Sequence, residues 1–396
     1  MRMRYFAVAM SCAVALMACS AGSDQEWAGS IETLANGGVV VLNPATGIWP
    51  ESETWRLVED LRIGSSHGSG PDVFSSLMSL SLAVDQDGRM FVLDGQSNEV
   101  RVFDRTGAHV LSFGRAGSGP GEMRSATIAG WDSEGALWIV DPRNGRYSAF
   151  SPAGDFQASY RRPITYSMSP WPGAVDTAGR ILDIGVRQGE RFVHTLVRVD
   201  PHAASADTFA LPGHDGGQFH ILNEAGQLMS SATIPFAGQL VWRLDPRGFV
   251  WSAVTDRYRV IQQSLEGDTV LIVQREADPI PVTPAERSAA LESLEDFVED
   301  GGRIDASRIP SIRPFLTSFA VDDRGYVWVA VQGPDDAEMV RYDVFRPDGR
   351  YLGAVPTTTS LAFWPAPPIF SEEFVYGFTR DQMGVPFLVR MRIEDR

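Results

Sequence analysis

The chain has 396 residues, 44% of them hydrophobic, and a formal net charge of −16 at pH 7. All 34 basic residues are arginine, which excludes Schiff-base chemistry, a P-loop lysine and a Ser–Lys dyad. A surface this acidic repels polyanions, so no nucleic acid is expected as a partner. The two cysteines, Cys12 and Cys19, lie near the N-terminus, so the body of the chain has no cysteine for a disulfide or a metal site.

Residues 1–18 have the pattern of a secretory signal peptide. Arg2 and Arg4 precede an apolar run from Phe6 to Ala18. This run is shorter than the ~20 residues that a membrane-spanning helix needs. We therefore expect the segment to direct export and to be removed.

The end of this segment, Leu-Met-Ala-Cys, resembles the lipobox of bacterial lipoproteins. The resemblance implies cleavage before Cys19 and acylation of Cys19, whose acyl chains would anchor the protein to a membrane of the cell envelope. Ser20 follows the cysteine, and the lack of Asp there favours the outer membrane. Residues 19–36 are then expected to form a polar tether. The alternative is an ordinary signal peptide with a chance cysteine.

From residue 37 onward, short β-rich runs recur with turns between them. Six runs resemble one another, and five of them follow a turn that begins with Asp and ends with Gly. The six runs are 89–95, 136–142, 180–186, 249–255, 326–332 and 374–380. Each is followed by a second strand, and successive turn glycines such as Gly88 and Gly107 lie 19 residues apart. This recurrence predicts an all-β fold, a six-bladed β-propeller over residues 37–396.

The stretch GRAGSGPGEM (114–123) allows two interpretations, a phosphate-binding loop or a crossing between two blades. A nucleotide loop needs a following helix, whereas residues 125–131 have the pattern of a strand, which favours the crossing. Residues 63–72 share Gly-Ser-Gly-Pro with it, so the preceding LRIG (61–64) is expected to be an outer strand. We expect this N-terminal strand to complete the last blade and close the ring. The strand-like run 37–44 has no assigned place.

One segment departs from the repeat, and it predicts a helical insertion between the fourth and fifth blades, at about 276–315. Thr283 as N-cap, Pro284 at the first position and Glu286 as the capping-box partner mark the start of a helix over 283–302. Its expected apolar stripe consists of Leu291, Leu294, Phe297 and Val298. We expect this helix to lie on the propeller.

The blades resemble NHL-type repeats, and the chain is similar to bacterial lipoproteins described as six-bladed β-propellers. The stretches that carry this similarity are 114–123, 258–283, 321–331 and 380–393. The resemblance implies the fold but no particular catalytic residues, because propellers serve many functions.

The favoured interpretation is a non-catalytic binding or scaffold module for a small polar ligand or a protein partner, without a cofactor. The loops that follow the recurring run of each blade are rich in Arg, Asp and Asn, and they meet around one end of a propeller. The candidate binding residues are Asn98, Arg143, Asn144, Arg187, Asp256, Asp335 and Asp336.

The alternative is an enzyme, a metal-dependent lyase or lactonase-like hydrolase that holds Zn or Ca. Its candidate metal ligands are His67, His214 and His220, although no spacing among the histidines indicates a site. Ser66 lies in a G-x-S-x-G match, but no helix follows, so a nucleophile elbow is not expected. The Asp residues of DQDG and DDRG are expected to stabilise turns.

Three tryptophans at repeat positions are expected to belong to the hydrophobic core and not to a binding site. Trp138, Trp251 and Trp328 occupy corresponding positions in three of the six runs. We expect them to pack between blades.

Overall fold

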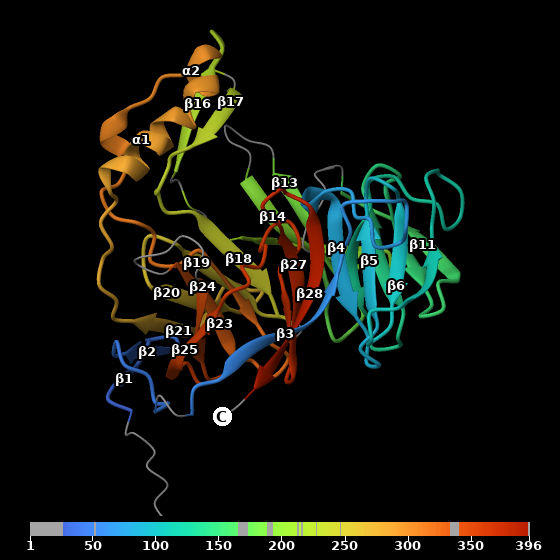
Figure 1. Cartoon of the computed structure of the whole chain (residues 1–396), viewed down its shortest axis with the longest axis horizontal. Coiled ribbons are helices and arrows are strands. Elements are labelled where there is room, and N and C mark those ends of the chain that lie inside the picture. Colours follow the sequence, from blue (N-terminus) through green and yellow to red (C-terminus); the bar gives the residue numbers. More distant parts are fainter. Residues whose placement is uncertain are drawn as a thin grey trace, which may run out of the picture.

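The computed structural model describes residues 27–50, 53–164, 173–187, 193–211, 214, 217–226, 228–245, 247–332 and 340–394. Its strands form six four-stranded antiparallel blades, which confirms the predicted propeller (Figure 1). Blade 1 contains β4 (Leu80–Val84), β5 (Met90–Asp94), β6 (Glu99–Phe103) and β7 (His109–Phe113). Blade 2 contains β8 (Thr127–Trp131), β9 (Leu137–Asp141), β10 (Arg146–Phe150) and β11 (Phe156–Arg161). Blade 3 contains β12 (Ala174–Val175), β13 (Ile181–Arg187), β14 (Val193–Asp200) and β15 (Ser205–Ala210).

The second half of the ring follows the same order from inner to outer strand. Blade 4 contains β18 (Leu240–Leu244), β19 (Val250–Val254), β20 (Arg259–Gln263) and β21 (Thr269–Arg275). Blade 5 contains β22 (Ser318–Val321), β23 (Val327–Gln332), β24 (Val340–Phe345) and β25 (Tyr351–Thr357). Blade 6 contains β26 (Ile369–Phe370), β27 (Phe374–Arg380), β28 (Pro386–Glu394) and, from the N-terminal region, β3 (Arg56–Ile63).

The N-terminal strand closes the ring as predicted. β3 pairs with β28 in an antiparallel register that runs from Leu388 opposite Ile63 to Glu394 opposite Arg56. Figure 1 shows β3, in blue, beside β28, in red. The sixth blade therefore joins both ends of the chain.

The run 37–44, which the sequence left without a place, forms β2 (Val39–Asn43) on the outer edge of blade 4. β2 is parallel to β21, and β1 (Ser30–Thr33) adds to β2 in antiparallel orientation. Blade 4 thus becomes a six-stranded sheet. β1 lies within residues 19–36, so regular structure begins inside the segment that was expected to be a polar tether.

A separate cluster of buried apolar side chains fills each of the six junctions between neighbouring blades. Trp138, Trp251 and Trp328 are at most 2% exposed and lie in three of these regions, as predicted. The alternation of side chains along each strand explains the arrangement, because both faces of a blade pack against a neighbour.

Two insertions form a second, smaller unit, which we call the accessory module. It consists of the hairpin β16 (Gln218–Leu222) and β17 (Leu228–Thr233) and the helices α1 (Pro284–Glu292) and α2 (Glu295–Glu299). Phe219 and Ile234 pack there against Leu294 and Phe297. Figure 1 shows the module projecting from one end of the propeller. Its hairpin lies in the connection between blades 3 and 4.

The predicted helix agrees with the observed one at its start but differs in its length, and it packs on the β16–β17 hairpin and not on the blades. Its capping box is confirmed, because the Thr283 hydroxyl accepts from the Glu286 N–H and the Glu286 carboxylate accepts from the Thr283 N–H. However, the chain breaks at Ser293 into two short helices, which rotates Leu291 and Val298 out of the common stripe. They are 37% and 47% exposed. No helix within the described residues is long and apolar enough to cross a membrane.

The antiparallel order gives the propeller two different ends. The turns between the first and second strands and between the third and fourth strands lie at one end, the turn face. The loops between the second and third strands lie at the other end, the loop face, together with the connections between blades. Both insertions of the accessory module are connections between blades, so the module is attached to the loop face.

At the turn face, an Asp begins the first turn of five blades. In each, its Oδ1 atom accepts the N–H groups two and four residues later, as predicted for the DQDG and DDRG turns. These residues are Asp85, Asp132, Asp176, Asp245 and Asp322. The second oxygen accepts from an Arg four residues later or from a Trp indole six residues later, as in Trp138 to Asp132 at 2.7 Å.

Candidate functional site

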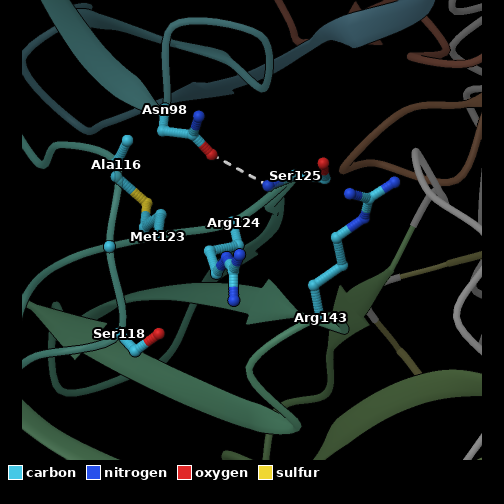
Figure 2. Close-up of a pocket in the computed structure, with 8 residues that line it drawn as sticks. Asn98, Ala116, Ser118, Met123, Arg124, Ser125 and Arg143 are labelled. Carbon is cyan, nitrogen blue, oxygen red and sulfur yellow. Dashed lines mark hydrogen bonds between the residues drawn. The ribbon is translucent and has the colours of Figure 1, made fainter.

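The loop face contains a cavity of about 480 Å³ between blades 1 and 2. Three segments form it: the β5–β6 loop, the crossing loop 114–126 that joins β7 to β8, and the β9–β10 loop. The lining residues are Asn98, Ala116, Gly117, Ser118, Met123, Arg124, Ser125 and Arg143 (Figure 2). Its size suits a small molecule, and its lining is mainly polar.

The crossing loop contains the GRAGSGPGEM stretch, and it runs from the outer strand of blade 1 to the inner strand of blade 2. It turns back on itself, because Ala116 and Met123 form a bridge and the Met123 N–H donates to the Arg115 carbonyl at 2.8 Å. Gly114 has φ 84°, and a Cβ there would lie 2.0 Å from the Met123 side chain. The stretch is therefore a blade crossing, as the sequence favoured, and it also walls the cavity.

Side chains of blade 2 hold this loop in one conformation. The Asn144 amide donates to the Gly117 carbonyl at 2.9 Å. The Arg146 guanidinium donates to the carbonyls of Ser118, Gly119 and Glu122 at 2.7–3.1 Å. Three loop carbonyls are thus satisfied by one cation, which prepares the cavity wall before any ligand arrives.

Two residues of the cavity have a left-handed backbone. Asn98 has φ 57° and Ser125 has φ 53°, and the Ser125 N–H donates to the Asn98 side-chain oxygen at 2.8 Å. Such a conformation is common for Asn but unfavourable for Ser. Strained backbone of this kind tends to occur at functional sites, where surrounding structure holds it. Here the Asn98 amide fixes the Ser125 N–H and links blade 1 to blade 2 (Figure 2).

Arg124 and Arg143 supply the charge of the cavity. Both are exposed. Among the described residues, neither guanidinium forms a hydrogen bond or an ion pair, and no lining residue is acidic. Figure 2 shows both arginines among the residues that line the cavity, together with Asn98, Ser118 and Ser125. The cavity is therefore locally cationic in a protein whose overall charge is −16.

The nearby carboxylates are directed into the wall and not into the cavity. Asp141 is fully buried and accepts from the Asn144 amide at 2.7 Å and from the Arg124 N–H at 3.2 Å. Burial raises the pKa of Asp141. Glu122 accepts from the Gly119 N–H, and this bond together with the Arg115 guanidinium holds the pKa of Glu122 below its usual range. Neither group neutralises Arg124 or Arg143.

The predicted binding residues have different places. Asn98 and Arg143 line the cavity, and Asn144 supports its wall. Asp256 is exposed in the β19–β20 loop on the same face, with an ion pair to Arg257 at 3.5 Å. Arg187 ends β13, but its side chain lies outside the described residues, as do Asp335 and Asp336.

The sequence interpretation missed Arg124, Ser125 and Ser118, because it considered only the loops between the second and third strands of each blade. In a meander the connection to the next blade emerges at the same end, so the residues after GRAGSGPGEM could have been included. The sequence did contain a signal for Arg124: it lies three residues before the predicted strand that forms β8, and so at the loop-face end of that strand.

Within the described part of the chain, no three His, Cys, Asp or Glu side chains are arranged to hold a metal. His67 lies in the loop before blade 1, with its Nδ1 atom 2.6 Å from the Ser66 hydroxyl. His214 contacts the Gly238 carbonyl at 2.9 Å, and His220 lies in β16. Ser66 is exposed in a loop without the helix that a nucleophile elbow needs.

Comparison with known proteins gives relatives by fold only. No protein-family model and no curated protein sequence matches the chain. A protein from Bacteroides fragilis, provisionally described as exported, is 10% identical, covers 90% of this chain and 99% of its own, and has a TM-score of 0.43. Virginiamycin B lyase from Staphylococcus aureus is 9% identical, with 86% and 99% covered and a TM-score of 0.43. A gluconolactonase from Xanthomonas campestris is 11% identical, with 78% and 85% covered and a TM-score of 0.39.

Proposed function

We propose that the chain is an exported, lipid-anchored propeller of the cell envelope that binds a small polar anion in the loop-face cavity without catalysing a reaction. The observation that carries the proposal is the pair of unpaired guanidiniums, Arg124 and Arg143, in a preformed polar cavity. Guanidinium groups bind carboxylate and phosphate through charge-assisted, often bidentate hydrogen bonds.

The surroundings favour a polar ligand over an apolar one. Drug-like pockets are mainly apolar, whereas Asn98, Ser118 and Ser125 here add amide and hydroxyl groups beside the two cations. A sugar acid or a phosphorylated sugar combines hydroxyls with a negative charge, so this chemical class fits best. The strained, cross-linked loop keeps the donors in place, which lowers the entropy lost on binding.

Calorimetric titration of the purified chain with glucuronate and with inorganic phosphate tests the ligand class. We expect a single site for at least one probe, and at least a tenfold loss of affinity in the Arg124→Gln/Arg143→Gln variant, in line with the loss of two charge-assisted contacts. The matched control is Arg346→Gln, which removes an exposed arginine from the turn face.

Each result has a clear consequence. Unchanged affinity in the double variant would contradict the proposed site. An equal loss in Arg346→Gln would show that only the overall charge matters.

The lipid anchor rests on the lipobox that ends at Cys19. In a bacterial host, Cys19→Ser should move the protein from the membrane to the soluble fraction and abolish labelling by radioactive palmitate. Ser20→Ala is the control, because it leaves the acylated cysteine unchanged. A Cys19→Ser protein that fractionates with membranes as the natural chain does would contradict lipidation.

A further inference from the structure

A second cationic site lies in the centre of the propeller, away from the loop-face cavity. Arg243 is on β18, the innermost strand of blade 4, and it borders a cavity of about 70 Å³. The innermost strands of blades 3 and 4 and the connection that leads to β26 line this cavity, through Gly173, Ala174, Trp242, Arg243, Leu244 and Pro367. Among the described residues that line it, the guanidinium of Arg243 is the one charged group.

The guanidinium of Arg243 has neutral partners alone. It donates to the Trp242 carbonyl at 2.7 Å, to the Ser318 hydroxyl at 2.9 Å and to the Phe363 carbonyl at 3.2 Å. Among the described residues no carboxylate pairs with it, and its buried Nε–H has no acceptor. Because arginine has five N–H groups, donor capacity remains.

Two other arginines of the blades that are largely shielded from water do have a carboxylate. Arg162 is bound to Asp183 at 2.6 Å, and Arg275 lies 3.3 Å from Asp343. Arg243 has no such partner among the described residues. Desolvation lowers its pKa to about 10, which still leaves the guanidinium charged at neutral pH. The rings of Phe319 and Phe363, each 6.0 Å from the guanidinium carbon, offset part of the charge. Arg243 is partly buried, and a charge that is partly withdrawn from water gains from a counter-ion beside it.

We propose that Arg243 and the small cavity beside it form an anion site on the propeller axis that takes a carboxylate no larger than acetate. The cavity has room for a group of this size but not for a sugar. The bound carboxylate would accept from the free N–H groups of Arg243 and supply the counter-ion that the protein does not provide. This site is independent of the loop-face cavity and of the function proposed for it.

The test compares acetate with gluconate at equal ionic strength. Both anions carry one carboxylate, but gluconate is too large for a cavity of about 70 Å³. At acetate concentrations tenfold above its dissociation constant, the melting temperature of the full chain should rise by about 1–3 °C relative to gluconate. The rise should persist in Arg124→Gln/Arg143→Gln, which separates this site from the loop-face cavity.

Two variants test the assignment to Arg243. Arg243→Met removes the charge at similar volume, and Ala174→Val narrows the cavity while keeping the arginine; each should abolish the difference between acetate and gluconate. Arg247→Gln, an exposed arginine nearby in the chain that pairs with Asp245, should retain it. An equal melting temperature in acetate and gluconate for the natural chain would overturn the proposal. So would an acetate effect that survives in both Arg243→Met and Ala174→Val.

Discussion

The first-turn aspartates of the turn face and two arginines of the loop face differ in how completely their charges are bonded within the protein. At the turn face, the first-turn aspartates of five blades are saturated by their own backbone and by a neighbouring Arg or Trp. At the loop face, Arg124 and Arg143 are exposed and have no partner among the described residues. Charges that are fully bonded inside the protein stabilise it, whereas unbonded ones are available to a ligand. The difference therefore predicts that the aspartates stabilise the fold and that the two arginines are available to a ligand.

The largest expected effect comes from opening the ring on which both faces depend. Deletion of residues 1–75 removes β3, which pairs with β28 along the whole length of the last blade. The loss exposes the edge of β28 and the apolar cluster between blades 6 and 1. We expect the truncated chain to lose cooperative thermal unfolding and near-UV circular dichroism.

Deletion of residues 1–37 is the control, because it removes β1 and leaves β3 in place. A chain without residues 1–75 that melts at the natural temperature would show that the ring closes in another way.

Much of this architecture follows from the sequence. The 19-residue spacing of turn glycines and the repeated Asp-led turns predict the blades, since these residues satisfy local backbone requirements wherever they occur. The Gly-Ser-Gly-Pro echo predicts the ring closure. The break in the helix at Ser293 was not predicted; there Leu294 and Phe297 pack on Phe219, which is distant in the chain. Likewise, β2 was visible as a strand, but its parallel partner β21 lies more than 200 residues away.

The candidate site was predictable only in part. Asn98 and Arg143 were identified because their loops share one end of the ring. Arg124 and Ser125 required the knowledge that the crossing loop folds back against blade 2. Arg243 could not be identified from the sequence, where it is one residue of an alternating strand. That no carboxylate of the described residues lies beside it follows only from how the blades assemble.

A buried ion pair between blades is expected to have the next largest effect. Asp183 is fully buried and accepts from the Arg162 guanidinium at 2.6 Å and from the Tyr147 hydroxyl at 2.8 Å. Asp183→Asn would remove the carboxylate that pairs with Arg162, whose side chain is 1% exposed. We expect a loss of about 3–5 kcal/mol in the free energy of unfolding, measured by urea denaturation.

The control is Asp207→Asn, which breaks an ion pair with Arg198 at the surface, where Asp207 is 66% exposed. Its effect should be within about 1 kcal/mol. Similar losses in both variants would mean that the buried pair has no special role in holding blades 2 and 3 together.

The smallest effects compare the two faces directly. Asp132→Ala removes the acceptor of the Glu134 and Ala136 N–H groups and of the Trp138 indole. The indole is almost fully buried, so the loss should be about 1–3 kcal/mol. Arg124→Gln and Arg143→Gln remove no hydrogen bond or ion pair among the described residues, so each should change the free energy of unfolding by less than about 0.5 kcal/mol. If either arginine variant were as destabilising as Asp132→Ala, the loop-face arginines would be structural, and the anion-binding proposal would lose its basis. A near-zero change together with weaker binding of glucuronate or phosphate would instead assign them to the ligand.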